Sequence, residues 1–310
     1  MAQASRVSSA WHLDGHSRMH GWSRRLLAGC SYSVVTLSCC LALQIVEDPA
    51  GHTATYEEGS SSAYPGKYLD CSWSPNDIDI FEQYGELHHL RCKGKADFKN
   101  RKKTIACIGD SITEGYHMKG NGSYPAKLYS LLHEQFNVLN LGVSGTTGQQ
   151  GRAHSYWTVP QWETALETEF DVAIVQFGSN DAKTENWDSS KYRQDYLEML
   201  RQLAQRHPQA TILVSVPPLA KSNSFGIQPD VVAAPLPEAI RDVARAAGLR
   251  LEPVDLPAAF ARAEQSAAAA ERPDAKALMK GDGVHPTGAG YLVIANAVAD
   301  AVRRALGLPP

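Results

Sequence analysis

Four near-continuous apolar runs, each followed by a stretch with a different periodicity, constrain the fold of this chain most. They cover residues 104–108, 138–141, 172–177 and 212–216. Runs of this kind are typical of parallel strands covered on both faces, whereas half-exposed strands alternate apolar and polar residues. A weaker fifth run lies at 249–254.

Helical periodicity appears between and after these runs. One face of a predicted helix carries Tyr192, Tyr196, Leu200 and Leu203, and one face of the last helix carries Tyr291, Ile294, Val298, Val302 and Leu306. Thr287 can cap that last helix. Alternation of strands and helices predicts a three-layer α/β fold with a doubly wound parallel sheet over residues 101–310. Ligands of such sheets bind outside the carboxyl ends of the strands.

Chemically useful residues lie where these strands end. Ser111 follows the first strand, Gly145 ends a loop after the second, and Asn180 follows the third. Asp282 and His285 lie in the loop before the last helix. Because the carboxyl ends of parallel strands share one edge of a sheet, we expect these five residues to lie close together.

A serine hydroxyl is a weak nucleophile at neutral pH and needs an adjacent base. His285 can be that base, and Asp282, three residues earlier, can hold its tautomer. A lone histidine in a loop is more often an ordinary surface residue. The spacing Asp-x-x-His together with the serine loop favours the catalytic interpretation, with Ser111, His285 and Asp282 as the reacting set.

Attack of a serine on an ester creates an oxyanion, which needs preorganised donors. We expect the backbone N–H groups of Ser111 and Gly145 and the side-chain amide of Asn180 to supply them. An ordinary turn at Gly145 and a capping role for Asn180 are the alternatives.

Other residues near these loops have supporting or alternative roles. Asp110 is predicted to tie its loop together by accepting backbone N–H groups, and Asn140 and Gly178 to support the two following loops. Asp110 and Glu114 could instead form a carboxylate pair for glycoside hydrolysis, but Glu114 also suits the first turn of a helix.

Three aromatic residues follow the two predicted oxyanion loops. Tyr156, Trp157 and Trp187 are predicted to be either core residues or walls of a substrate pocket.

The motifs resemble the GDSL/SGNH hydrolases. The blocks of that family stand here as Gly109-Asp110-Ser111, Asn140-x-Gly142-x-x-Gly145, Gly178-x-Asn180-Asp181 and Asp282-x-x-His285-Pro286. The resemblance covers about residues 103–306. It implies a flavodoxin-like SGNH hydrolase fold and a serine esterase that uses no cofactor and no metal.

Two local features of the resemblance concern the substrate. Residues 144–151 are similar to a loop of the thioesterase I/lysophospholipase L1 group. Residues 178–183, followed by Asn186-Trp187, are similar to carbohydrate or sialate O-acetylesterases. We favour a carbohydrate or other small O-acyl ester, with a lysophospholipase or acyl-thioesterase as the alternative. A non-catalytic ligand-binding module on the same fold is an alternative of another class.

The segment before the predicted fold divides into a leader, 1–48, and an extension, 49–100. Basic residues precede an uncharged apolar stretch at 26–46. This pattern predicts a signal peptide or a membrane anchor, and hence a secreted or membrane-anchored protein, with organelle targeting as a further alternative. In an oxidising compartment, Cys71 and Cys92 would be the natural disulfide pair. The formal net charge of −3 and the absence of long basic runs in the body of the chain make nucleic acid an unexpected partner.

Overall fold

The computed structural model describes residues 44–47, 53–57, 68–69, 90–91, 102–118, 122–269 and 277–309. Most of the leader and of the 49–100 extension lies outside these ranges, as do Cys71 and Cys92. The predicted signal or anchor and the predicted disulfide therefore stay predictions. No helix within the described ranges is both long and apolar enough to cross a membrane. Of the apolar stretch 26–46, only its last three residues are described, and they belong to a strand.

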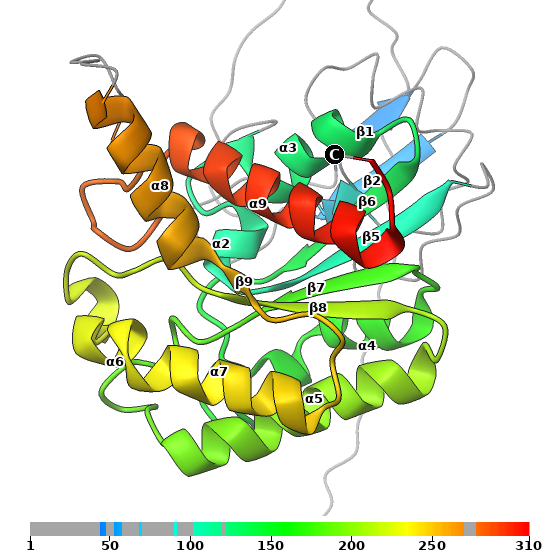
Figure 1. The fold of residues 1–310 in the computed structure, drawn as a ribbon. Coiled ribbons are helices and arrows are strands. Elements are labelled where there is room, and N and C mark those ends of the chain that lie inside the picture. The colour runs from blue at the N-terminus through cyan, green and yellow to red at the C-terminus, as the bar shows by residue number, and fades with distance from the viewer. Residues whose placement is uncertain are drawn as a thin grey trace, which may run out of the picture. The chain divides into compact units, whose positions relative to one another are not determined.

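A six-stranded parallel sheet forms the centre of the described part of the chain (Figure 1). Its strands are β4 (Leu90–Arg91), β5 (Lys103–Gly109), β6 (Phe136–Gly142), β7 (Val172–Gln176), β8 (Thr211–Val216) and β9 (Val254–Asp255). The order across the sheet is β4-β6-β5-β7-β8-β9, and every neighbouring pair is parallel. Apart from the edge strand β4, this is the flavodoxin-like order. The predicted doubly wound parallel sheet is confirmed.

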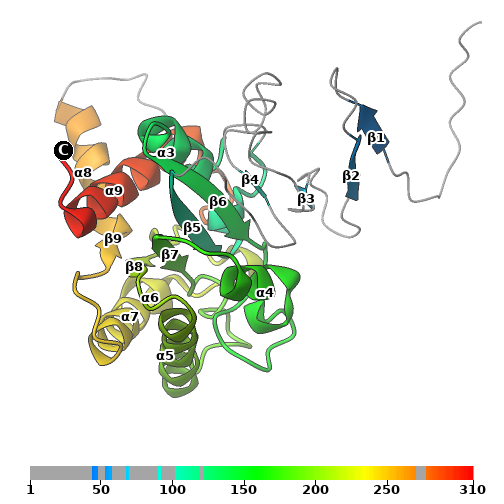
Figure 2. The same ribbon diagram turned by 90° about the vertical axis from the view of Figure 1, so that its right-hand side faces the viewer.

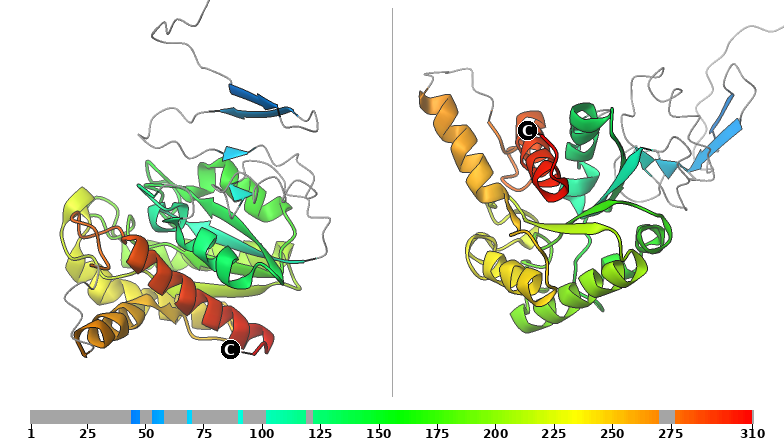
Figure 3. Two further views of the ribbon diagram at one scale, coloured as in Figure 1. Left: turned by 90° about the horizontal axis from the view of Figure 1, so that it is seen from above. Right: turned by 45° about the vertical axis from the view of Figure 1, so that its right-hand side comes forward.

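Helices cover both faces of the sheet, which gives the predicted three layers (Figures 1 and 2). One face carries α3 (Tyr124–Leu132), α8 (Leu256–Ala269) and α9 (Gly288–Leu306). The other face carries α4 (Pro160–Glu167), α5 (Ser189–Arg206), α6 (Pro229–Ala233) and α7 (Pro235–Ala246). The right-hand view of Figure 3 shows the two helical layers on opposite sides of the strands. As predicted, Thr287 caps α9, and its side chain accepts from the backbone N–H of Gly290 at 3.3 Å.

The core divides along the alternation of the central strands. In β5, Ala106 and Ile108 face the layer of α4 to α7, while Ile105 and Cys107 face the layer of α3, α8 and α9. All four side chains are fully buried. Burial of a large aliphatic side chain stabilises the fold by about 1.5–3 kcal/mol, so these continuous apolar runs hold both helical layers on the sheet.

Two elements of the sheet differ from the sequence prediction. The fifth run, 249–254, forms only a short strand, β9, at its end. Pro253 explains this difference, since proline has no N–H to donate to a neighbouring strand. The edge strand β4 lies in the 49–100 extension and pairs with β6. Two residues are too few to show a periodicity, so the apolar pattern did not predict β4 as a strand of the parallel sheet.

Three further strands precede the parallel sheet. They are β1 (Gln44–Glu47), β2 (Thr53–Glu57) and β3 (Tyr68–Leu69), and they form an antiparallel sheet in the order β1-β2-β3.

Candidate active site

Ser111 lies at the carboxyl end of β5, the strand beside which the chain reverses its direction of winding. It begins the short helix α2 (Ser111–Glu114), which Asp110 caps by accepting the N–H of Ile112 at 2.9 Å. The helix packs so closely against β6 that a Cβ atom at Gly142 would lie only 2.1 Å from the backbone nitrogen of Glu114. Glycine at position 142 therefore lets the serine-bearing turn sit directly on the neighbouring strand.

Hydrogen bonds join Ser111, His285 and Asp282 in a chain. The Oγ of Ser111 lies 3.0 Å from Nε2 of His285, and Nδ1 of His285 lies 2.8 Å from Oδ2 of Asp282. These contacts bring together residues 174 positions apart in the sequence. A serine joined in this way can pass its proton to the imidazole when it attacks an electrophile.

Burial and charge act on the two titratable partners in different ways. The side chain of His285 is only 5% exposed, and this burial lowers its pKa although the Asp282 carboxylate opposes the shift. Burial acts to raise the pKa of Asp282, but hydrogen bonds from the backbone of His285 and Val284 and from the His285 side chain outweigh it, and the net shift is downward. The histidine is thus kept neutral and the aspartate ionised, the states that a base and its orienting acid need.

The loop that carries Asp282 and His285 is a tight turn. One carboxylate oxygen of Asp282 accepts the N–H groups of Val284 and His285, both at 2.9 Å. Gly283 takes a φ of +69°, the left-handed conformation that glycine adopts without strain. The N–H of Lys280 closes the turn on the carbonyl of His285 at 2.8 Å. Glycine at position 283 therefore permits the turn.

Lys280 also joins this loop to the serine loop. Its Nζ donates to the backbone carbonyl of Tyr116 at 2.6 Å. Burial lowers the pKa of Lys280, although the nearby Asp282 acts in the opposite direction. The sequence pattern assigned this lysine no role.

Two of the three predicted oxyanion donors are backbone groups. In the described part of the chain, no hydrogen bond engages the N–H of Ser111 or of Gly145. Gly145 has a φ of +81°, and a Cβ atom there would meet no other atom within 4 Å, so this loop borders open space.

The third predicted donor, Asn180, is held by its neighbours. Its side-chain amide donates to the carbonyl of Thr146 at 3.1 Å, and its own backbone carbonyl accepts from the side chain of Asn186 at 2.9 Å. The Thr146 contact fixes the amide beside the loop of Gly145. A primary amide has two N–H groups, so one such contact leaves a second donor.

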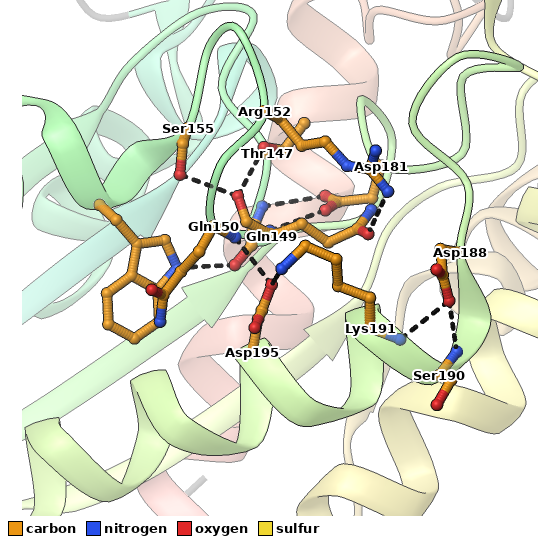
Figure 4. Close-up of polar contacts among 12 residues, drawn as sticks. Thr147, Gln149, Gln150, Arg152, Ser155, Asp181, Asp188, Ser190, Lys191 and Asp195 are labelled. Atoms are coloured by element: carbon orange, nitrogen blue, oxygen red, sulfur yellow. Dashed lines mark hydrogen bonds and ion pairs between the residues drawn. The ribbon is translucent and has the colours of Figure 1, made fainter.

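Asp181 fastens the Asn180 loop to the residues after Gly145. Its two carboxylate oxygens accept the N–H groups of Gly148 and Gln149, both at 3.0 Å (Figure 4). Burial raises the pKa of Asp181 to about 6, although these donors oppose the shift. Sequence reasoning gave Asp181 no role, and its place next to Asn180 in a glycine-led block was the available signal.

Two residues of α5, Lys191 and Asp195, hold the same loop in place. The N–H of Gln150 donates to Asp195 at 2.8 Å, and Lys191 forms an ion pair with the same carboxylate oxygen at 2.7 Å (Figure 4). The loop between β6 and α4 is therefore held by carboxylates from two other segments.

The predicted supporting residues lie in the expected loops. The carbonyl oxygen of the Asn140 side chain accepts from Gly142 at 3.0 Å, and its amide donates to the carbonyl of Glu114 at 3.2 Å. Gly178 takes a φ of +136°, and the side chain of Leu236 packs against the position that a Cβ atom would take there.

Asp110 accepts a backbone N–H, as predicted. Its second oxygen, Oδ2, is buried with no hydrogen-bond partner among the described residues, and burial raises the pKa of Asp110 to about 7.

The three aromatic residues predicted for the core or a pocket wall separate. Tyr156 is fully buried, and its hydroxyl donates to the carbonyl of Leu141 at 2.6 Å. It is a core residue and lines no open pocket, because its ring packs against Trp162 and Phe177. Trp157 and Trp187 keep partial exposure at the margin of the same core. The Trp157 ring nitrogen donates to the carbonyl of Gly148 at 2.8 Å.

Two aromatic rings next to His285 were not indicated by the sequence. Tyr116 stacks on the imidazole with ring centroids 4.2 Å apart, and Phe225 meets it edge-on at 5.4 Å. Neither residue belongs to a motif, so only the folded chain reveals them. Within the described residues, no group of three or more histidine, cysteine, aspartate or glutamate side chains is arranged to hold a metal ion.

Comparison with known proteins gives relatives of two kinds. An acetylxylan esterase from Xylanibacter ruminicola is 38% identical over 102 residues, which are 32% of this chain and 21% of that protein. The thioesterase 1/protease 1/lysophospholipase L1 of Escherichia coli K12 is 31% identical over 78 residues, 25% of this chain and 35% of that protein. The matches thus span about a third or less of the length of these relatives.

The fold also has relatives among solved structures. Est24, a carbohydrate acetylesterase from Sinorhizobium meliloti, matches with a TM-score of 0.50 and 16% identity, over 66% of this chain and 99% of that one. The sequence model of the GDSL-like lipase/acylhydrolase family matches residues 107–293, which is more than half of the chain and contains all four motif blocks. The chain therefore belongs to the GDSL-like lipase/acylhydrolase family.

Proposed function

We propose that this protein is a serine ester hydrolase in which Ser111 is the nucleophile, His285 the general base and Asp282 its orienting acid. The observation that carries the proposal is the hydrogen-bonded chain from Ser111 Oγ through His285 to Asp282, with contacts of 3.0 and 2.8 Å. Membership of the family supports the same reaction class.

In the first step, Nε2 of His285 takes the hydroxyl proton of Ser111 while Oγ attacks the ester carbonyl carbon. The attack needs a neutral imidazole with its other proton on Nδ1. Burial favours the neutral state by lowering the pKa of His285, and the Asp282 carboxylate accepts the Nδ1 proton in a hydrogen bond.

The tetrahedral intermediate carries its charge on the former carbonyl oxygen. We propose that the N–H groups of Ser111 and Gly145 and the amide of Asn180 bind this oxygen. Two observations support this assignment. The two N–H groups have no partner in the described part of the chain, and Thr146 holds the Asn180 amide beside Gly145.

The intermediate collapses when His285 gives its proton to the departing alcohol oxygen. This leaves an acyl group on Ser111 Oγ. A water molecule then repeats the sequence, with His285 as base for the water and later as acid for Ser111. The acid is released and the enzyme returns to its starting state.

For the substrate, we propose an O-acetyl ester of a carbohydrate. The 38% identity to the acetylxylan esterase supports this choice. A lysophospholipid or acyl thioester is the second candidate, and the 31% identity to the lysophospholipase L1 supports it. Because the matched stretches cover small parts of both relatives, activity must decide between the candidates.

The test measures product release by the full chain from acetylated xylose, a lysophospholipid and a long-chain acyl thioester. We expect acetate release from the sugar ester and little turnover of the two long-chain substrates. Ser111→Ala should abolish turnover, whereas Ser130→Ala makes the same change on the exposed side of α3 and should leave it intact. Substantial activity remaining in Ser111→Ala would refute the mechanism, and preference for a long acyl chain would favour the second candidate.

A ligand-binding module without turnover is the alternative of another class. An activated serine reacts with a fluorophosphonate probe, whereas an ordinary hydroxyl does not. We expect the probe to label the wild-type chain at Ser111 and to leave Ser111→Ala unlabelled. Failure to label the wild-type chain would favour the binding module.

A further inference from the structure

Phe225 presents an exposed aromatic ring beside the proposed base. Its residue is 51% exposed, more than any other large hydrophobic residue in the described part of the chain. Its ring centroid lies 5.4 Å from that of His285, at an interplanar angle of 74°. An apolar ring that stays in water next to a buried catalytic group needs an explanation.

The backbone at Phe225 is in a conformation that bulky residues rarely adopt. Its φ is +60° and its ψ is +18°, inside the short turn η4 (Ser224–Gly226). Phenylalanine has no polar side chain to compensate for this left-handed conformation, and such outliers gather at functional sites. The residue type therefore calls for a role other than making the turn.

One side of this turn is fastened to the loop of Asp282 and His285. The N–H of Lys221 donates to the carbonyl of Gly283 at 2.7 Å, and the Ser222 hydroxyl donates to the carbonyl of Asp282 at 2.5 Å. Phe225 is thus tied to the same loop that carries the base.

The other side of the turn is fastened to the loop that follows Asn180. The N–H of Thr184 donates to the carbonyl of Gly226 at 3.2 Å, and the N–H of Gln228 donates to the carbonyl of Ala182 at 3.1 Å. Ile227, in between, is only 2% exposed. Loops from both sides of the site therefore hold Phe225 in place, although its ring is exposed.

The chemistry of the reaction indicates which half of an ester would meet this ring. His285 gives its proton to the leaving alcohol oxygen, so the alcohol half must lie next to Nε2 of His285 in the transition state. Tyr116 already covers one face of the imidazole, with an interplanar angle of 29°. The exposed ring in contact with His285 is that of Phe225, so the alcohol half would lie against it.

We propose that Phe225 is the platform on which the sugar ring of the alcohol half rests, a proposal that itself depends on the function proposed above. A pyranose has apolar C–H faces that pack on an aromatic ring and hydroxyl groups at its edge that need polar partners. Glu185 would be one such partner, because it lies beside the same turn: its Oε2 is 3.6 Å from the position a Cβ atom would take at Gly226. Phe225 would then select ring-bearing alcohols and leave the choice of acyl group to other residues.

The test compares two esters with the same acetyl group, acetylated xylose and ethyl acetate, by following acetate release. Phe225→Asn removes the ring but keeps a residue that tolerates a positive φ, so the turn should survive. We expect kcat/KM for acetylated xylose to fall roughly three- to tenfold, mainly through KM, and that for ethyl acetate to stay within about twofold. Phe225→Trp keeps an aromatic ring, so kcat/KM for acetylated xylose should stay near the wild-type value. Leu131→Asn, at an exposed position on α3, should change kcat/KM for neither ester.

Four outcomes would overturn this inference while leaving the proposed hydrolase in place. In Phe225→Asn, the two esters could lose activity equally, which would mean that the ring acts through His285, or neither ester could be affected. The pH profile for ethyl acetate could shift, which would mean that the ring shields His285. The wild-type chain could cleave ethyl acetate but not acetylated xylose. If the wild-type chain cleaves neither ester, or Ser111→Ala still cleaves both, the proposed function itself fails.

Discussion

Glu114 and Ser144 join the serine loop to the loop of Gly145. A carboxylate oxygen of Glu114, Oε2, accepts the backbone N–H of Ser144 at 2.7 Å, and the Ser144 hydroxyl donates to the same oxygen. Glu114 ends the helix that Ser111 begins, and Ser144 directly precedes Gly145. The proposed nucleophile and a proposed oxyanion donor are therefore linked through the carboxylate of Glu114, a residue that is only 6% exposed.

Glu114→Gln removes the charge from this contact and should loosen the Gly145 loop. Hydrogen bonds to a charged group contribute about 1.5–3 kcal/mol, so we expect kcat to fall about tenfold or more with little change in KM, because the oxyanion forms only after attack. Steady-state kinetics on acetylated xylose measure both constants. Glu163→Gln, an exposed first-turn acid of α4, is the matched control. A rise in KM with kcat unchanged would contradict the positioning role.

The pH dependence of activity should follow His285. Catalysis needs the neutral imidazole, so kcat/KM falls as the pH drops through the pKa of His285. Burial holds this pKa below its ordinary value of 6.5, and the midpoint of the acid limb should lie below 6.5 as well. A midpoint above 6.5 in the rate profile of the wild-type chain would contradict this assignment.

Asp282→Asn tests the other half of the pair. The change removes the carboxylate that raises the pKa of His285, so the acid limb should move to still lower pH. It also removes the acceptor that fixes the tautomer, so kcat should fall on the order of 10⁴-fold. Asp300→Asn, an exposed change on α9, should alter neither quantity. Retention of most of the activity in Asp282→Asn would show that His285 does not depend on this acid.

Asn180→Ala should weaken stabilisation of the oxyanion. Loss of one donor costs about 2.7–4 kcal/mol of transition-state stabilisation, or about 10²- to 10³-fold in kcat. Because Asn180 also donates to Thr146, urea unfolding must be measured beside the kinetics to separate loss of a donor from loss of the loop. Asn186→Ala is the control variant. It removes a hydrogen bond to the backbone carbonyl of Asn180 but leaves the side-chain amide of Asn180 in place. An equal effect in the two variants would indicate a structural role for Asn180.

Much of the fold follows from the sequence because its signals are local. Continuous apolar runs marked the four long strands, and the Thr287 cap marked the start of α9. The sequence also indicated that Ser111, Asp282 and His285 lie close together. Ser111 follows a strand of a parallel sheet, whose strands end at one edge, and the other two residues lie in the loop before a helix.

The residues that the sequence did not reveal act through long-range contacts. Tyr116 and Phe225 reach His285 across long stretches of chain, and Glu114 meets Ser144 across 30 residues. None of these contacts leaves a spacing or a periodicity to read. Tyr156 illustrates the opposite problem, because an aromatic residue after a loop can face either the core or the solvent, and only packing decides.

Asp110 should make the stability of the fold depend on pH. Burial raises its pKa from 3.8 to about 7, so between these values the folded chain binds a proton that the unfolded chain has released. Stability therefore falls as the pH rises through this range, and the fall ends once the folded carboxyl has also ionised. Asp181, whose pKa is raised to about 6, acts in the same direction.

Asp110→Asn should remove the Asp110 part of this dependence while keeping an N-cap for α2, since asparagine caps helices as well as aspartate does. We expect the loss of unfolding free energy between pH 4.5 and pH 8 to shrink by roughly 2–4 kcal/mol, as measured by urea denaturation at both pH values. Asp188→Asn makes the same change at the exposed N-cap of α5 and should leave the loss unchanged. If Asp110→Asn leaves the loss unchanged too, the pKa of Asp110 is not raised in the folded chain, which would contradict this prediction.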